Sequence, residues 1–502
     1  MKLYSRKTVA LLIMLLVLVL TLAACRDRDD ETEPVSTAND GEQPGDTPTP
    51  DPGTNNVEDP VPPPVDEPNI RGVHAPRDLG GRTVVVASSW GNAMPFSIPS
   101  RMDEEPDPAV TENYHIQRRI WDNAIRVEQE FNFVLDYVHV VDDFMGVFTA
   151  SALAGDPVGD LVFLGGSELL VSVIGDLIMP LSVINLPGSD ILGGPGHYGR
   201  ITQNAFGEDW GFYYNSRNPH IWMMGVNLDI IHAIGAPNPV DLYNAGQWNW
   251  DNALNIMRMA TRDTTGDGIF DQWGIAGQPG DLADHFIASN DGPLVDANLQ
   301  YAFDHPNTIE ALEFMEVIFR EGLWQYDPVL GLNPGDWGRN FFAFQEGNAA
   351  LFKSVIWGMN GGDLPFNFAV VPFPTGPSNT TGSTWSSGWA GGLSIPFGTA
   401  WSPEDLLMIT EEYLAWPGGE LDLIHEGSYQ TPRATFQTEE DVQRWAANVF
   451  RDRSDIGKVV PEYYWVLGGF VTHFANGTMS VMEAIEAYRQ PQQELLDLFF
   501  VR

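Results

Sequence analysis

The sequence TVVVA at residues 83–87 is a β-branched run, and two glycines at positions 80 and 81 precede it with only Arg82 between. A short apolar run bounded in this way predicts a strand buried on both faces, which is typical of a parallel sheet. Apolar residues then recur every three or four positions over residues 116–131, which predicts a helix covering that strand. A second apolar run, LVFL at residues 161–164, predicts another strand, with Ser167 as the N-cap of the next helix. The order strand, helix, strand predicts an α/β fold built on a parallel sheet.

Three later helices are predicted from their first residues. Asn307, with Glu310 three positions on, marks the start of one helix, and residues 402–415 form a second. Ser480 and Glu483 have the spacing of a capping box, so the last helix starts there and runs almost to the end of the chain.

The N-terminus carries an export signal. LAAC at residues 22–25 closes an apolar stretch that follows three basic residues, and Cys25 is the only cysteine of the 502 residues. The stretch is short for a transmembrane helix, which needs about 20 residues. It resembles a bacterial lipoprotein signal, which implies a signal peptide over residues 1–24, lipidation of Cys25 and a place on the outer face of the cell membrane. A short N-terminal anchor with a buried cysteine is the alternative.

Residues 25–79 are predicted to be a disordered tether. They are rich in Asp, Glu, Pro and Thr and contain few large apolar residues, so they cannot bury enough surface to fold. The whole chain has a net charge of −42, from 68 acidic and 26 basic residues. This charge argues against nucleic acid as a partner, and it leaves the lipid anchor as the only membrane contact. With one cysteine, no internal disulfide can form.

Six separate segments follow one another along the chain. They are GDLIMPL at 175–181, IWMMGVNLDIIHAIG at 221–235, WNWD at 248–251, FQEGNAAL at 344–351, VPFPTGP at 371–377 and GLSIP at 392–396. Together they resemble one family, the carbohydrate-binding solute-binding lipoproteins of ABC importers, of the maltose-binding-protein-like family 1 type. Val226 and Leu228 stand where the family usually has a tyrosine and a lysine, so only Asn227 of that motif carries over.

The resemblance implies a two-lobed, periplasmic-binding-protein-like α/β fold with hinge strands and a ligand cleft between the lobes. By this analogy residues 80–212 and 385–425 form the first lobe, and residues 213–384 and 426–502 form the second. It further implies a non-enzymatic, monomeric protein that captures a carbohydrate, an oligosaccharide by preference, and delivers it to the permease subunits of an ABC importer.

Sugars bind to aromatic faces and to planar hydrogen-bonding groups. The chain has 16 tryptophans, several of them in predicted loops, where an exposed ring is a better site candidate than on a helix face. For each tryptophan, packing between a helix and the sheet is the alternative, and Glu168 and Arg433 can instead cap a helix or form a surface ion pair. The predicted ligand-binding residues are Trp90, Asn92, Glu168, Trp357, Asn360, Trp385, Trp389 and Arg433.

Residues 263–271 resemble the calcium loop of an EF-hand. The predicted ligands are Asp263, Thr265, Asp267, the carbonyl of Ile269, and Asp271. Position twelve departs from the pattern, because glycine stands where the bidentate glutamate is expected. A structural Ca²⁺ ion or a metal-free Asp/Gly turn both fit this sequence, and no cofactor is required for function.

The chain lacks the local motifs of common enzymes. It has no Gly-x-Ser-x-Gly elbow, no His-Glu-x-x-His and no phosphate-binding loop. Two alternatives to import remain: a cell-surface glycoside hydrolase, whose paired carboxylates have no local signature, and a carbohydrate-binding adhesion lipoprotein.

We expect Cys25→Ser to abolish lipidation and to leave the protein unprocessed or shed, because the thiol of Cys25 is the only one that can carry the lipid. Detergent partitioning and the mass of the N-terminal peptide measure this. A Cys25→Ser protein that loses its signal peptide and still partitions into detergent like the parent contradicts the lipobox interpretation.

Overall fold

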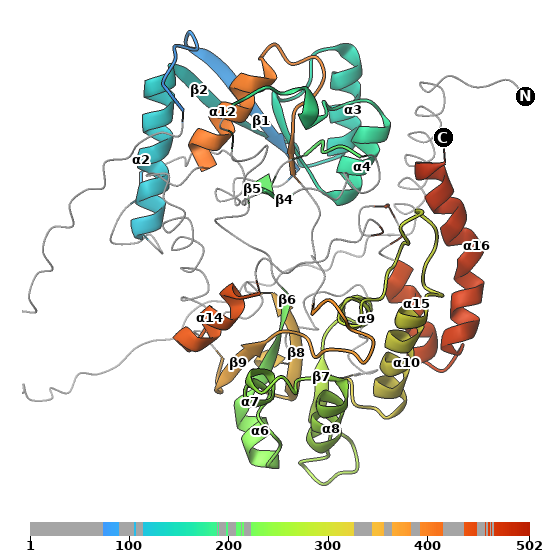
Figure 1. The fold of residues 1–502 in the computed structure, drawn as a ribbon. Coiled ribbons are helices and arrows are strands. Elements are labelled where there is room, and N and C mark those ends of the chain that lie inside the picture. Colours follow the sequence, from blue (N-terminus) through green and yellow to red (C-terminus); the bar gives the residue numbers. More distant parts are fainter. Residues whose placement is uncertain are drawn as a thin grey trace, which may run out of the picture. The chain divides into compact units, whose positions relative to one another are not determined.

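The structure is a computed structural model, and only the second of the two compact units of the chain, Ile70–Arg502, contains described residues. Along this unit, helices and strands alternate with segments that are not described (Figure 1). The described residues are 74–89, 105–106, 114–187, 189, 197–198, 207–211, 213–214, 222–325, 344–355, 364–382, 392–414, 436–448, 457, 460–461, 463 and 466–501.

The first sheet is a four-stranded sheet in the order β10-β3-β1-β2. β1 pairs in parallel with β2 and with β3, and β10 pairs antiparallel to β3. The strands are β1 (Arg82–Ser88), β2 (Phe133–His139), β3 (Leu161–Leu164) and β10 (Gly392–Ser394). The two strands predicted from the apolar runs are confirmed, as is their parallel arrangement. β2 was not predicted.

Helices cover the first sheet. α2 (Tyr114–Phe131) and α12 (Pro403–Leu414) pack against each other, and both helices that were predicted in these regions are confirmed. The buried side chains of α12 join those of β1 and β3 in one apolar cluster. α3 (Phe144–Ala154) and α4 (Gly166–Ile174) are also parts of this α/β unit. Gly165 occupies the N-cap of α4, so the prediction of Ser167 as the N-cap is wrong by two residues.

The second sheet has the order β7-β8-β6-β9. β7 and β8 are parallel, and β6 runs antiparallel to both β8 and β9. β7, β8 and β9 therefore point the same way. The strands are β6 (Trp222–Asn227), β7 (Trp273–Ala276), β8 (Ala349–Val355) and β9 (Phe368–Val371). A separate two-stranded sheet pairs β4 (His197–Tyr198) with β5 (Tyr213–Tyr214).

The helices around the second sheet contact it and one another. α8 packs on β7, α14 packs on β9, and α9, α10, α15 and α16 form a connected layer. These helices are α6 (Leu228–Ile234), α7 (Pro239–Asn244), α8 (Trp250–Ala260), α9 (Pro279–Ala288), α10 (Pro306–Arg320), α14 (Glu439–Ala446), α15 (Val466–Ala475) and α16 (Val481–Phe500), with the 3-10 turn η1 (Leu181–Val183) earlier in the chain. None of the helices that the structure describes combines the length and apolar character needed to cross a bilayer.

Two helix starts test the capping predictions. Ser480 and Glu483 form the predicted capping box, because the Glu483 amide donates to Ser480 Oγ at 3.3 Å and the Ser480 amide donates to Glu483 Oε2 at 2.8 Å. α10 starts slightly earlier than predicted, with His305 as the N-cap. Its ring nitrogen Nδ1 accepts a hydrogen bond from the amide of Asn307 at 3.2 Å.

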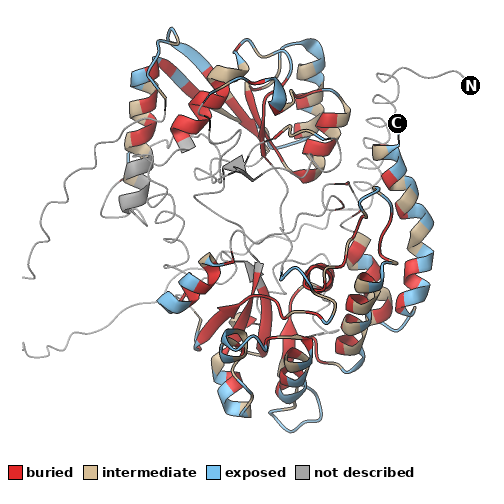
Figure 2. Cartoon of the chain, in the orientation of Figure 1, coloured by how far each residue is buried: buried red, intermediate tan, exposed pale blue. Residues whose placement is uncertain are grey.

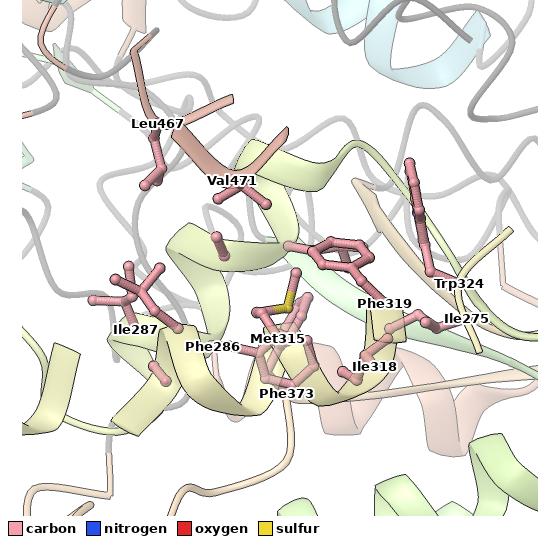
Figure 3. Packing of buried hydrophobic residues seen from close by; sticks show 14 of the residues in the cluster. Ile275, Phe286, Ile287, Met315, Ile318, Phe319, Trp324, Phe373, Leu467 and Val471 are labelled. Carbon is pink, nitrogen blue, oxygen red and sulfur yellow. The ribbon is translucent and has the colours of Figure 1, made fainter. Parts of the chain in front are cut away.

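The largest apolar cluster lies between the second sheet and its helices. Phe286 on α9, Met315 on α10 and Phe373 after β9 meet there with side chains from α15 (Figure 3). The rings of Phe286 and Phe373 are 5.7 Å apart and edge-on. Most described strands are buried and most helices bury one face and expose the other (Figure 2). The exceptions are β2, which exposes alternate residues of its first half, and α9, which is buried along its whole length.

The first described residues are attached to α12 by charged groups. His74 Nε2 lies 2.5 Å from the buried carboxylate of Glu411, and the backbone amide of His74 donates to Glu412 at 2.5 Å. Arg77 forms an ion pair with Asp405. The hydrogen bond to Glu411 raises the pKa of His74, the charges of Glu411 and Glu412 act in the same direction, and burial and Arg77 oppose them.

We expect the bond between His74 and Glu411 to stabilise the fold in a pH-dependent way. Because the folded pKa of His74 is raised, its contribution is fully present below the ordinary value and is lost as pH rises through the folded value. The difference in urea midpoint between the parent and His74→Gln should therefore be largest below the ordinary histidine pKa of 6.5 and should shrink as the pH rises above it. A difference that stays constant on both sides of this value contradicts the prediction.

Candidate functional site

Ligands of open α/β sheets bind beyond the carboxyl ends of parallel strands, so the candidate site lies at those ends. In the first sheet β1, β2 and β3 end at one edge because they are parallel. In the second sheet β7, β8 and β9 end at one edge for the same reason. We call each of these two edges a ligand edge.

Ser88, Tyr137 and His139 lie at the ligand edge of the first sheet. The Val140 amide donates to the Ser88 carbonyl at 3.0 Å, which ties the end of β1 to the end of β2. The half-buried phenol of Tyr137 has a raised pKa, because burial disfavours its ionised form more than a hydrogen bond with Ser88 favours it. Sequence reasoning missed Tyr137. The available signal was its position two residues before the end of β2, a strand whose first residues alternate between buried and exposed.

Glu168 lies directly after β3, in the first turn of α4. Its Oε2 accepts a hydrogen bond from the Gly165 amide at 2.6 Å. Burial raises the pKa of Glu168, and the bond from Gly165 opposes that rise. The carboxylate thus caps its helix, which is one of the two roles expected for it. Contact with a ligand stays a prediction.

The other predicted ligand-binding residues lie outside the described residues. These are Trp90, Asn92, Trp357, Asn360, Trp385, Trp389 and Arg433, and the predicted lipidation site Cys25 lies outside them too. Along the chain, Trp90 comes two residues after β1 and Trp357 two residues after β8. Both therefore follow strands that end at a ligand edge.

Asp291 anchors the chain where it leaves the second sheet for the segment that carries Trp385 and Trp389. Its carboxylate accepts hydrogen bonds from the amide and hydroxyl of Thr380, at 2.6 and 3.0 Å, and from those of Thr381, at 3.0 and 2.6 Å. Burial acts to raise the pKa of Asp291, but the bonds from Thr381 and Thr380 outweigh it and lower the pKa. Four donors of Thr380 and Thr381 therefore bind one carboxylate, which fixes the chain shortly before the segment that carries Trp385 and Trp389.

The calcium-like loop is an exposed turn between α8 and β7. Asp263 accepts hydrogen bonds from the amides of Gly266 and Gly268, both at 2.6 Å. These bonds, that from Gly268 first, lower the pKa of Asp263. Asp271 accepts from the amide of Thr264 at 2.7 Å, which lowers its pKa as well. Both carboxylates are thus kept ionised within one turn.

The predicted calcium ligands therefore lie in one turn. Their carboxylates are not grouped closely enough to hold an ion without the hydroxyl and carbonyl ligands. Thr265 Oγ1 lies 3.2 Å from Asp263 Oδ1, and Asp267 accepts a bond from the Ile269 amide at 2.9 Å. In the described part of the chain, no group of three or more His, Cys, Asp or Glu side chains is placed to hold a metal ion. Calcium would need Thr265 and the Ile269 carbonyl among its ligands, and its binding stays a prediction.

Packing explains the glycine at position twelve. Gly274 belongs to β7, and a Cβ atom built on it would lie 2.5 Å from the Cα of Met257 on α8. No side chain fits there without separating the helix from the strand, so the bidentate glutamate of an EF-hand is sterically excluded. Any calcium at this loop would lack a glutamate at position twelve, so it would be bound more weakly than in an EF-hand or take a ligand from elsewhere.

We expect Asp267→Ala to lower the melting temperature in calcium buffer to the value that the parent shows with chelator. Asp267→Asn, which keeps one ligand oxygen, is the matched control and should lose less. Scanning calorimetry with calcium and with chelator measures both. Equal melting of the parent under the two conditions would leave only the metal-free turn.

Comparison with known proteins identifies the fold. No protein-family model matches the chain, and no curated protein matches it. Among solved structures, the cyclic α-maltosyl-1,6-maltose binding protein from Arthrobacter globiformis is similar at a TM-score of 0.56 and 17% identity, covering 83% of this chain and 99% of that one.

Two further structures agree. A cyclo/maltodextrin-binding protein complexed with maltotetraose has a TM-score of 0.55 and 13% identity, with 83% and 96% of the two chains covered. UspC from M. tuberculosis has a TM-score of 0.55 and 16% identity, with 82% and 100% covered. At these identities the likeness concerns the fold. The chain has the two-lobed, periplasmic-binding-protein-like α/β fold.

Proposed function

We propose that this protein is the substrate-binding lipoprotein of an ABC importer and captures a carbohydrate, by preference an oligosaccharide, between its two lobes. The observation that carries the proposal is the likeness in fold of more than four fifths of the chain to sugar-binding proteins, one of them described as an ABC substrate-binding protein in complex with cycloalternan. The six ordered sequence segments, the lipobox at Cys25 and the tryptophans that follow strand ends support it.

The proposed chain of events needs no catalysis. Lipidated Cys25 holds the protein at the outer face of the cell membrane, and the tether of residues 25–79 lets the monomeric folded part reach both sugar and permease. Tryptophan faces stack on the sugar ring, and amide and carboxylate groups bind its hydroxyls. Lobe closure then presents the loaded protein to the permease subunits.

Thermal shift and calorimetry on the full chain test this function. The panel contains maltotetraose, cyclic α-maltosyl-1,6-maltose and the monosaccharide glucose. A ligand at 100 times its dissociation constant adds about 2.7 kcal/mol to the free energy of unfolding. We expect a shift with an oligosaccharide and no change in the sugar after long incubation. Release of reducing ends would indicate a glycoside hydrolase, and binding only to polymer or cells would indicate an adhesion protein.

We expect Trp357→Ala to weaken the binding of the best panel sugar by roughly 1 to 3 kcal/mol, through lost stacking and buried area, without unfolding the protein. Calorimetric affinity and the urea midpoint are measured on the same variant.

Trp250→Ala is the matched control for the Trp357 experiment. Trp250 is buried and stacks on Phe314 with ring centroids 4.5 Å apart. Its truncation should cost about 3 to 5 kcal/mol of stability. If Trp357→Ala behaves like this control and its affinity is unchanged, Trp357 belongs to the core and not to the binding site.

A further inference from the structure

A buried ion pair lies at the ligand edge of the second sheet. Lys353 on β8 is 3% exposed, and its Nζ lies 2.6 Å from Oδ2 of Asp281, which is 4% exposed. Asp281 is the third residue of α9, where the helix dipole favours a carboxylate. Lysine is rare in this chain, with four residues in the whole sequence, and this one follows four apolar residues of β8.

The pair joins the ends of two neighbouring strands. Lys353 is two residues from the end of β8, and β7 connects to α9 through Gly277 and Gln278 alone. Gly277 has a φ of +145°, and a Cβ atom built on it would lie 3.2 Å from the Cβ of Lys353. The connection after β7 thus runs directly against β8, and Asp281 ties it there.

The next turn of α9 reaches the third strand end. His285 is buried, and its Nδ1 lies 2.7 Å from the carbonyl of Asp281, so Nδ1 must be the donor. The imidazole faces the ring of Phe373, two residues after β9, with centroids 4.7 Å apart. Asp284 is buried beside His285, 3.6 Å from its Nδ1. The first two turns of α9 therefore hold the carboxyl ends of β7, β8 and β9 together.

Stability alone does not account for a pair in this place. Replacing a buried ion pair by apolar residues of similar volume is often neutral or stabilising, because desolvation offsets the Coulomb attraction. Removing one partner, by contrast, is strongly destabilising. What a hydrogen-bonded pair adds over apolar packing is direction: it permits one arrangement of the two groups.

We propose that the Lys353–Asp281 ion pair is a positioning element that fixes the carboxyl end of β8 against the start of α9. Trp357 and Asn360, the predicted ligand-binding residues, follow this strand end in the sequence. The consequence for affinity rests on the proposed function. The consequence for local rigidity does not.

The test compares the parent with the double variant Asp281→Leu/Lys353→Met, which replaces the pair by apolar groups. We expect a urea midpoint near that of the parent, together with amide hydrogen exchange at least about tenfold faster over residues 277–282 and 349–355. Affinity for the tightest-binding panel sugar should fall at least about tenfold.

A second buried pair on the same sheet serves as the control. Asp441 and Arg444 on α14 are buried and bond to the backbone of Val370, one residue before the end of β9, a strand that β6 separates from β8. Asp441→Leu/Arg444→Met should therefore leave exchange over residues 277–282 and 349–355 unchanged.

Parent-like exchange and affinity in the Asp281/Lys353 double variant would overturn the proposal, since packing alone would then hold the edge. Failure of every panel sugar to bind the parent would count against the proposed function, and the exchange data would still decide the positioning role. If the double variant does not fold, Asp281→Glu replaces it. This variant keeps both charges but lengthens the pair by one methylene, and unchanged exchange would again overturn the proposal.

Discussion

A parallel strand needs cover on both faces and a crossover helix before its next partner, and this requirement organises both sheets. The pairing of β1 with β3 places α2 and α3 between strands that are neighbours in the sheet. It also brings the carboxyl ends of β1, β2 and β3 to one edge. The same rule gives β7, β8 and β9 a common edge in the second sheet, although β6 runs against them. The position of the candidate site thus follows from the direction of the strands.

The parts of this arrangement that could be predicted are those whose signal is local. The apolar runs of β1 and β3, the amphipathic face of α2 and the capping box of α16 each lie within a few residues. β2 escaped prediction because FVLDYVH exposes every second residue of its first half and ends in a polar residue, which weakens the apolar signal. Ser167 failed as an N-cap because the glycine before the helix already had the extended backbone that the cap requires.

The ligand edge was only partly predictable. Tryptophans and amides after strand ends can be found from sequence, because the motif and the strand lie together. The contact between Lys353 and Asp281 spans 72 residues and has no local signature beyond a charge in an apolar strand. For Gly274 the sequence was sufficient to find the departure from the calcium pattern but not to explain it. The close approach of Met257, which leaves no room for a side chain at position 274, explains the glycine.

The distribution of charge connects the core with the proposed ligand. The chain has 68 acidic and 26 basic residues. Within the described residues, several basic side chains form ion pairs with buried carboxylates, among them Lys353, Arg126 and Arg444. Each such pair buries one positive and one negative charge together, so the excess of acidic over basic residues remains for the rest of the chain. An acidic surface repels anionic partners, and salt screens this over about 8 Å at physiological ionic strength. A neutral sugar is not affected by that field, so its capture depends on aromatic faces and on hydrogen-bonding groups held in a fixed geometry. Under the proposed function, the Lys353–Asp281 pair therefore acts on recognition through the position of a strand end and not through its charge.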